Sequence, residues 1–289
     1  MKVASLQEKQ RSGSVRCLVC NHYCTIPEGK RGACGTKENI SGVLYSLNYG
    51  KTVARALDPI EKKPLYKFLS GSLTYSFASP GCNFSCTWCQ NSSFSQISPL
   101  NPADGGHNIS PAEHVQAALS AECSSISYTY SEPTIFLEYA LETMRLAKNV
   151  NLKNIWVSNG YMSAESMKLI LPLLDAANVD LKGDEQVYRN YCGGKLEPIK
   201  QNLELLCRAG IHLELTTLIV PGVNDSPELI SELAEYISQK LNPDIPWHLT
   251  RFFPAWQEKH RLPTPLETIR KAEKIAKKYD LRNIYLGNI

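Results

Sequence analysis

The stretch that decides the fold is Leu73-Thr-Tyr-Ser-Phe-Ala78-Ser-Pro-Gly-Cys82-Asn-Phe-Ser-Cys86-Thr-Trp-Cys89, an apolar strand-like run followed by a tight turn and three cysteines. Three thiols at C-x3-C-x2-C spacing after a buried strand indicate a metal site. A structural zinc ion and an ordinary four-iron, four-sulfur cluster each take four protein ligands, whereas this loop supplies three. One coordination position is therefore expected to stay open, as it does in metal sites that carry out chemistry.

The overall composition is that of a globular protein. The 289 residues are 43% hydrophobic, enough for one large domain or two medium ones with a substantial core. A formal net charge of +3 is too small to indicate a nucleic-acid partner. The N-terminus has no signal-peptide core and no apolar run is long enough to cross a bilayer, so we expect a cytoplasmic protein without a membrane partner. Ten cysteines are expected to stay reduced there and to be available as metal ligands.

A second cysteine group lies near the N-terminus, where Cys17, Cys20 and Cys24 are followed by Cys34. The glycines around them predict a loop-rich subdomain, which we place with its connector in residues 1–67, ahead of a main domain in residues 68–289. Four thiols can hold a zinc ion or a fully ligated second iron-sulfur cluster. Their irregular spacing also leaves open a set of reduced cysteines without metal.

Beyond residue 67, strand-like and helix-like segments alternate. The predicted strands are Leu73–Ala78, Ser125–Tyr130, Asn154–Ser158, Asn178–Leu181, His212–Ile219 and Trp247–Phe252. The predicted helices are Pro111–Glu122, Thr134–Asn149, Ala164–Asp175, Pro198–Ala209, Pro227–Lys240 and Leu266–Lys278. Six such units predict parallel strands with right-handed crossovers, and about 220 residues are too few for a complete eight-unit barrel. We therefore predict an α/β fold, a partial (β/α)6 TIM-like barrel with a small cysteine-rich N-terminal subdomain.

Polar residues mark all six predicted strands at or near the edge where ligands bind in barrels and open α/β sheets. In strand order these are the cysteine loop, Ser131-Glu132-Pro133, Ser158-Asn159-Gly160, Asp180-Leu-Lys182, Pro221-Gly-Val-Asn-Asp225 and, on the sixth strand, His248. Because the carboxyl ends of parallel strands meet at one edge, these groups predict a single site.

These features resemble the radical S-adenosylmethionine (SAM) superfamily, in which a C-x3-C-x2-C loop follows the first strand of a partial barrel. The resemblance covers residues 73–289 and implies that Cys82, Cys86 and Cys89 hold a four-iron, four-sulfur cluster. It also implies that the open iron takes the amino and carboxylate groups of S-adenosylmethionine, which would account for the missing fourth ligand.

The chain resembles more closely the activating enzymes of glycyl radical enzymes, and among them the radical SAM enzyme of the AmmeMemoRadiSam system. The stretches that carry this likeness are Asp58-Pro-Ile-Glu-Lys-Lys-Pro-Leu-Tyr66, Tyr130-Ser-Glu-Pro-Thr134, Asp180-Leu-Lys182, Val220-Pro-Gly-Val-Asn-Asp225 and the N-terminal cysteines. Where that group usually has Gly-Gly-Glu, this chain has Tyr130-Ser131-Glu132. Glu132 is then the match for the residue that holds the amino end of the cofactor's methionine.

The chemistry of the remaining polar groups suits the same cofactor. Ser158 and Asn159 are short side chains of the kind that ribose hydroxyls need, and Asp180 and Lys182 alternate on one strand and so face one side. Because either charge alone is costly inside a barrel, we expect the two to pair and face the ligand, with a purely structural ion pair as the alternative. His248 faces the barrel interior, either as a cofactor contact or as a satisfied core histidine. Cys192 is expected to be an exposed loop thiol.

The sequence thus predicts a radical SAM oxidoreductase that cleaves its cofactor reductively and abstracts hydrogen from a substrate it does not identify. A low-potential flavodoxin- or ferredoxin-type protein is the expected electron donor, and the substrate is a small molecule or a partner protein, as in pyruvate formate-lyase activation. No single side chain is assigned as catalytic. The alternative is a non-catalytic iron-sulfur or zinc protein, an electron carrier or an interaction module, which would have four ligands per metal site and no polar pocket.

Overall fold

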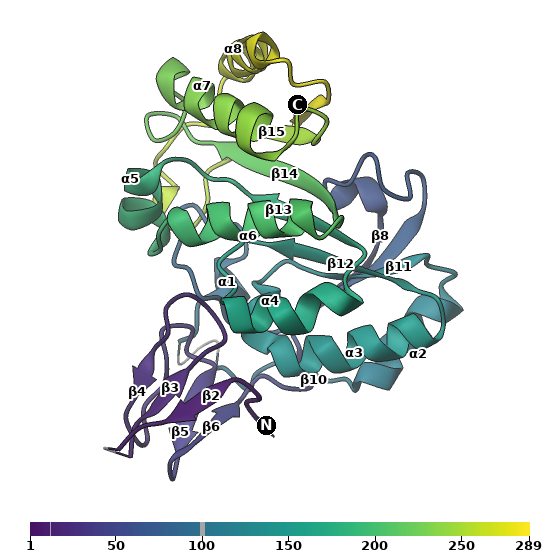
Figure 1. Ribbon diagram of the computed structural model, residues 1–289, viewed down its shortest axis with the longest axis vertical. Coiled ribbons are helices and arrows are strands. Elements are labelled where there is room, and N and C mark those ends of the chain that lie inside the picture. The colour runs from purple at the N-terminus through teal and green to yellow at the C-terminus, as the bar shows by residue number, and fades with distance from the viewer. Residues whose placement is uncertain (12, 99–101) are drawn as a thin grey trace.

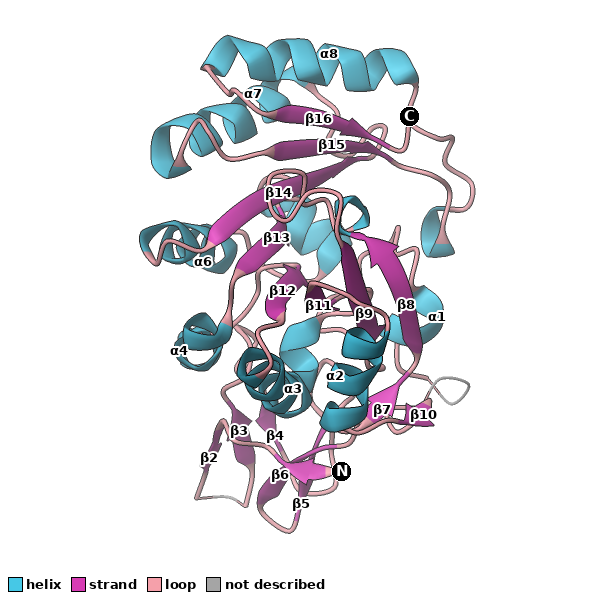
Figure 2. Ribbon diagram, turned by 90° about the vertical axis from the view of Figure 1, so that its right-hand side faces the viewer, coloured by secondary structure: helices cyan, strands magenta, loops and turns pink. Residues whose placement is uncertain are grey.

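The computed structural model describes residues 1–11, 13–98 and 102–289 (Figure 1). Its centre is an eight-stranded sheet in the order β16-β15-β14-β13-β12-β11-β9-β8. Seven strands are parallel neighbours: β9 (Leu73–Ala78), β11 (Ser125–Tyr128), β12 (Lys153–Ser158), β13 (Ala176–Asp180), β14 (His212–Ile219), β15 (Trp247–Arg251) and β16 (Ile284–Gly287). The eighth, β8 (Ala54–Pro59), is antiparallel to β9. Within the described residues the edge strands β8 and β16 do not pair, so the curved sheet stays open (Figure 2).

Helices cover the outer side of this sheet (Figure 2). The main ones are α2 (Pro111–Ser120), α3 (Leu137–Asn149), α4 (Ala164–Ile170), α6 (Glu197–Arg208), α7 (Pro227–Tyr236) and α8 (Leu266–Ala276). Two further helices are short, α1 (Ser92–Ser95) and α5 (Glu185–Val187). Single turns mostly extend or connect the helices: η2 (Pro133–Phe136), η3 (Leu171–Leu173), η4 (Tyr188–Cys192), η5 (Ile237–Leu241), η6 (Trp256–Glu258) and η7 (Lys277–Tyr279). Strands buried on both faces, such as β11 with all four residues buried, require this cover.

The predicted partial barrel is confirmed, and the structure adds two strands to it. All six predicted parallel strands are present within three residues of their expected ends. Residues 284–287 form a seventh parallel strand beside β15. The sequence analysis did not predict this strand, because the apolar run Ile284-Tyr-Leu is short. Residues 54–59, expected to belong to a small cap and connector, pair with β9 as an edge of the main sheet. The boundary after residue 67 stays a prediction.

Local sequence signals account for several helix ends. Ser110 and Glu113 form a capping box at the start of α2, with the Glu113 amide donating to the Ser110 hydroxyl at 3.3 Å. Ser163 caps α4 by accepting from the Ser166 amide at 3.1 Å. After α6, Gly210 has the positive φ of 70° that ends a helix without a Cβ clash.

The N-terminal region forms small antiparallel sheets at one end of the molecule (Figure 1). They contain β1 (Lys2–Val3), β2 (Gln7–Lys9), β3 (Val15–Cys17), β4 (Thr25–Ile26), β5 (Lys37–Ile40) and β6 (Val43–Ser46), while β7 (Lys51–Thr52) pairs with β10 (His107–Asn108). A buried ion pair, Lys37 Nζ to Glu138 Oε2 at 2.7 Å, fixes this region to α3. Among the described residues, none of the helices has the length and apolar character needed to span a bilayer.

Candidate active site

Four of the six predicted groups converge on one cavity of about 370 Å³ at the carboxyl ends of the parallel strands, whereas neither the Pro221–Asp225 group nor His248 lines it. Its walls include Cys82, Cys86, Cys89, Glu132, Ser158, Asn159, Asp180 and Lys182. Phe84, Trp88, Thr129, Tyr130, Val157, Thr216, Leu218 and Thr250 complete much of the rest. A site of this size, with a few convergent polar groups among apolar ones, is typical of a cofactor pocket.

The cysteine loop leaves β9 through a turn that only glycine fits. Gly81 has φ +99°, and a Cβ there would lie 2.5 Å from Thr36 Cγ2 and 3.2 Å from the carbonyl oxygen of Cys34. Phe84 and Trp88 are each only 4% exposed, so they shield the loop from water. The Phe84 amide donates to Cys82 Sγ at 3.4 Å, the kind of N–H···S bond that supports a metal-bound thiolate.

The three thiols differ in their surroundings. Burial raises the pKa of Cys82 and of Cys89, because the thiolate loses water. The pKa of Cys86 is lowered, chiefly by a hydrogen bond from the Cys192 thiol and further by the charge of Lys182, against the effect of burial. Metal ligation supplies the positive charge that buried thiolates lack.

Cys192 is not the exposed loop thiol that the sequence predicted. It is fully buried at the end of η4, against the cysteine loop. The Ser85 amide donates to the Cys192 carbonyl at 3.0 Å and the Thr87 amide to the Tyr191 carbonyl at 3.0 Å. The neighbouring Gly193-Gly194 pair suggested an exposed turn, but glycine is present there because a Cβ at Gly194 would lie 2.3 Å from Phe84.

Glu132 is the buried carboxylate of the cavity, 3% exposed. Its Oε1 accepts from the Thr134 amide at 3.1 Å, the Thr134 hydroxyl at 2.5 Å and the Ser158 hydroxyl at 2.8 Å. Its Oε2 accepts from the Asn159 amide at 2.8 Å. Burial raises the pKa of Glu132, and these hydrogen bonds oppose the rise. Because a carboxylate offers about four lone-pair sites, Oε2 keeps acceptor capacity for a cationic ligand.

Asn159 links the third strand end to the cysteine loop. Its Nδ2 donates to Asn83 Oδ1 at 2.7 Å and lies 3.9 Å from Cys82 Sγ, and its Oδ1 accepts from the Tyr161 amide at 3.0 Å. Ser158 connects to Glu132 as described and accepts from the Gly160 amide at 3.0 Å. Glu132, Ser158 and Asn159 therefore form one hydrogen-bonded wall beside the thiols.

Asp180 and Lys182 pair as expected, with 2.7 Å between Oδ2 and Nζ. Burial would lower the pKa of Lys182, but Asp180 and then Cys86 raise it well above its ordinary value. The Asp180 side chain is 35% exposed and both residues line the cavity, so the pair faces the ligand space. Tyr188 braces this strand end by donating to the Asp180 carbonyl at 3.1 Å and accepting from the Lys182 amide at 2.9 Å.

His248 is not among the residues that line this cavity, so the structure gives no support to a cofactor contact. Its Nε2 lies 2.6 Å from Glu214 Oε2, and its ring stacks on Tyr285 at 5.2 Å between centroids. Glu214 also accepts from the Tyr66 and Lys67 amides, at 3.0 and 2.8 Å. His248 is thus the satisfied core histidine of the alternative interpretation, in a layer nearer the amino end of β15.

Tyr130 is a cavity residue to which the sequence analysis gave no role. It has φ +66°, a strained value for a non-glycine residue, and its ring lies 4.1 Å from Lys63 Nζ. Its hydroxyl donates to Asp58, which also pairs with Lys63 at 2.7 Å. The only sequence signal was the exchange of the usual first glycine of Gly-Gly-Glu for tyrosine.

The N-terminal cysteines lie around a separate, very small cavity. In residues 1–11, 13–98 and 102–289, no three His, Cys, Asp or Glu side chains already surround one metal position. This finding applies to both cysteine groups.

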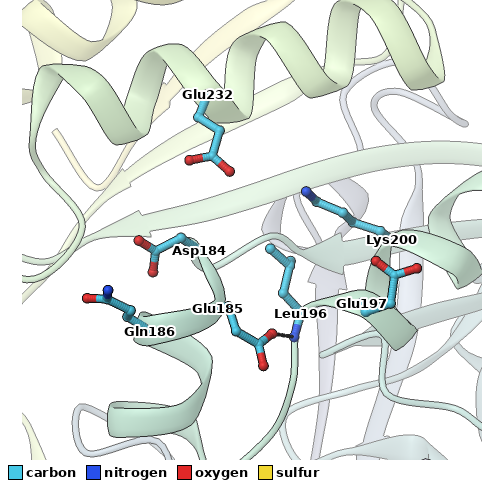
Figure 3. A pocket seen from close by; sticks show the side chains of 7 residues that line it. All are labelled: Asp184, Glu185, Gln186, Leu196, Glu197, Lys200 and Glu232. Atoms are coloured by element: carbon cyan, nitrogen blue, oxygen red, sulfur yellow. Dashed lines mark hydrogen bonds between the residues drawn. The ribbon is translucent and has the colours of Figure 1, made fainter.

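A second cavity, of about 390 Å³, lies on the helical side of the sheet, among α5, α6 and α7 (Figure 3). Its labelled side chains are Asp184, Glu185, Gln186, Leu196, Glu197, Lys200 and Glu232. Asp184 caps α5 by accepting from the Val187 amide at 2.9 Å, and Glu185 accepts from the Leu196 amide at 2.8 Å. These carboxylates serve the fold, and none of the cysteines lines this cavity.

The residues of the first cavity fit a site-differentiated iron-sulfur cluster with a bound zwitterionic cofactor. Three thiols supply three iron ligands, and among the described residues no fourth sulfur lines the cavity. Glu132 offers an acceptor for an ammonium group on the same wall.

Comparison with known proteins agrees with this chemistry. A sequence model described as the Radical SAM superfamily matches residues 77–234, more than half of the chain. An uncharacterized protein of Methanocaldococcus jannaschii is 38% identical over 289 residues, which is 100% of this chain and 86% of that protein.

Two solved structures have a similar fold. A domain of pyruvate-formate lyase-activating enzyme from Bacteroides vulgatus gives a TM-score of 0.50 at 16% identity and covers 57% of this chain and 99% of that one. A radical SAM methyltransferase from Sphaerobacter thermophilus gives 0.54 at 17% identity and covers 76% and 67%. At these identities the likeness concerns the fold alone.

Proposed function

The chain belongs to the radical SAM superfamily, and from this premise we propose that it is an enzyme that cleaves S-adenosylmethionine reductively in the cavity of Cys82, Cys86 and Cys89. The observation that carries the proposal is one cavity with three thiols and a buried carboxylate that keeps a free acceptor site. In an electron carrier, a fourth thiolate would complete the cluster, and no ligand pocket would be needed beside it.

The cluster, when bound, supplies the electron that breaks the sulfur–C5′ bond of S-adenosylmethionine, giving methionine and a 5′-deoxyadenosyl radical that takes a hydrogen atom from a substrate C–H bond. One electron enters for each cofactor cleaved, from a low-potential flavodoxin- or ferredoxin-type donor. The protein must then hold the cofactor in place and keep water out.

The wall of Glu132, Ser158 and Asn159 performs the first of these tasks. Glu132 Oε2, which accepts from the Asn159 amide, would also accept a hydrogen bond from the amino group of the methionine, and a charge-assisted bond to a carboxylate is about twice as strong as a neutral one. The Ser158 hydroxyl and Asn159 amide lie on the same wall, where ribose hydroxyls find partners. Asn159 also donates to Asn83, so this wall is hydrogen-bonded to the cysteine loop.

Lys182 lines the cavity together with Asp180. Its ammonium pairs with Asp180 and interacts electrostatically with Cys86. A cluster with three thiolates is negatively charged, so this cation would stabilise the bound cluster and its reduced form. Phe84 and Trp88, both buried, exclude water from the cluster side.

The substrate enters through the open side of the sheet. In the described chain β8 and β16 are unpaired edges, and Asn288, just after β16, lines the cavity. An opening of this kind accommodates the backbone of a partner protein, as in glycyl radical activation, as well as a small molecule. A glycine-centred radical detected on a co-purified partner would identify a protein substrate.

The test is anaerobic reconstitution with iron and sulfide, followed by dithionite and S-adenosylmethionine, with 5′-deoxyadenosine measured by chromatography. The wild-type enzyme forms 5′-deoxyadenosine, Cys86→Ala forms none, and Cys207→Ala, changed on α6 away from the cavity, behaves as wild type. Retention of cluster and cofactor cleavage by Cys86→Ala would overturn the proposal.

A further inference from the structure

The four N-terminal cysteines surround a cavity of about 10 Å³. It is lined by Cys17, Cys20, Cys24 and Cys34, with Val19, His22, Ile26, Gly32, Ala33, Lys37 and Ile135 around them. Lys37 could repel a cation, but its ammonium is engaged by Glu138 at 2.7 Å. Four thiols thus line one small cavity in an otherwise apolar environment.

Each of the four sulfur atoms has a polar group as hydrogen-bond partner. The Ala33 amide donates to Cys24 Sγ at 3.5 Å, and the Thr36 hydroxyl lies 3.2 Å from Cys34 Sγ. The backbone amides of Val19 and His22 form hydrogen bonds with the sulfurs of Cys17 and Cys20. Neutral thiols are weak acceptors and do not need such partners, whereas metal-bound thiolates are regularly supported by them.

Size distinguishes between the two metals that four cysteines bind. A volume of about 10 Å³ is close to that of one water-sized sphere, so it suits a single atom and not a cubane of eight. Four thiolates around one ion favour zinc, which takes them in a tetrahedron at about 2.3 Å. The sulfurs are not yet arranged around a common point, so rotation of the side chains would close the site.

The geometry points to one structural zinc ion bound by Cys17, Cys20, Cys24 and Cys34. This ion would hold in shape a loop that braces the active-site wall. The inference does not rest on the cofactor chemistry proposed above.

The proposed zinc ligands lie in residues 17–34, called the zinc loop below. The cysteine loop of the active site contacts this zinc loop. His22 Nε2 lies 2.7 Å from the carbonyl oxygen of Asn83, and the Cys34 carbonyl lies 3.2 Å from the Cβ position of Gly81. Gly81 and Asn83 flank Cys82 directly. The zinc loop therefore contacts the backbone on both sides of a cluster ligand.

The zinc loop also contacts the third strand end. The Asn21 amide donates to the Tyr161 carbonyl at 3.1 Å, and the hydroxyl of Ser166 donates to the Val19 carbonyl at 2.6 Å. Cys20 forms an isolated β-bridge with Met162, three residues after Asn159. A loop without its ion would loosen two walls of the cavity together.

The test is metal analysis of the full-length chain, purified anaerobically and reconstituted, by inductively coupled plasma mass spectrometry. We expect about one zinc and about four irons per chain. Cys24→Ser, at the least buried end of the set, should lose zinc at least tenfold, retain about four irons when freshly reconstituted, and then lose iron several-fold faster than the wild type. The matched control Cys207→Ser, a half-buried cysteine on α6, should keep both metals and the wild-type rate of iron loss.

Zinc K-edge absorption of the wild-type enzyme keeps the test independent of how the variant folds. Four sulfur neighbours at about 2.3 Å are the expected result. A chain without zinc, about eight irons per chain, or a zinc shell of nitrogen and oxygen would overturn the inference. Zinc with this shell in an enzyme that makes no 5′-deoxyadenosine would refute the proposed function alone.

Discussion

Replacing Glu132 with glutamine removes one charge from the cavity and leaves the volume of the side chain almost unchanged. Three hydrogen-bond donors converge on Oε1 and one on Oε2, so either orientation of the new amide turns an NH2 group toward a donor. Such a buried conflict costs about 1–3 kcal/mol of folding free energy. The lost charge-assisted bond between the methionine amino group and the carboxylate costs about 1.5–3 kcal/mol more in binding, a roughly 10- to 150-fold weaker Kd for S-adenosylmethionine.

The assay is calorimetric titration of S-adenosylmethionine into the reconstituted, oxidised enzyme at matched iron content, with urea unfolding measured in parallel. Glu138→Gln is the control, because Glu138 is an equally buried carboxylate, 6% exposed, that pairs with Lys37 outside the cavity. The control should lose stability and keep its cofactor affinity. A Kd for Glu132→Gln within twofold of wild type, at full iron content, would refute the role of Glu132.

Three further outcomes follow from the same contacts. Lys182→Met should lower the reduction potential of the cluster on the order of tens of millivolts, because the reduced cluster loses a nearby cation; a redox titration followed by electron paramagnetic resonance measures this, and an unchanged potential contradicts it. Cys192→Ser should keep about four irons per chain, because Cys192 hydrogen-bonds to Cys86 and is not a ligand; halved iron content would make it one. Burial pushes the pKa of Glu138 up, but Lys37 overrides this and lowers the pKa from 4.5 to about 2, so its stabilisation is complete above pH 4.5 and is lost as the pH falls toward 2. Urea unfolding between pH 7 and 3 should show this loss in the wild type and a flatter profile in Glu138→Gln, which lacks about 3 kcal/mol at neutral pH; parallel profiles would contradict the assignment.

The parallel sheet was predictable because its signals are local. Each strand is a short apolar run with polar residues at or near its end, and helix starts such as Ser110 carry their own capping residues. The edge strands were not predictable in the same way. Residues 54–59 alternate between exposed positions and positions that are half-buried or, at Asp58, buried, and only their pairing with β9 places them in the main sheet. Residues 284–287 are half-buried throughout and gave too short a signal.

The position of the cavity was predictable from the order of strands along the chain, because the carboxyl ends of parallel strands meet at one edge of the sheet. This argument placed Glu132, Asn159, Asp180 and Lys182 on one cavity with the cysteine loop. The separate prediction of an exposed Cys192 was wrong, because its burial depends on packing against a segment about a hundred residues earlier. The position of His248 also depended on such long-range contacts, because depth along a strand, set by Glu214 and Tyr66, decides whether an inward side chain reaches the ligand.

The central claim is that three thiolates leave one iron open for S-adenosylmethionine. Electron paramagnetic resonance of the reduced enzyme, recorded with and without saturating S-adenosylmethionine, tests it directly. The account predicts that the cofactor changes the g values of the reduced cluster, and that Cys82→Ala, Cys86→Ala and Cys89→Ala each abolish the signal. A cluster spectrum that does not respond to the bound cofactor would contradict the account, because it would mean that all four irons already have protein ligands.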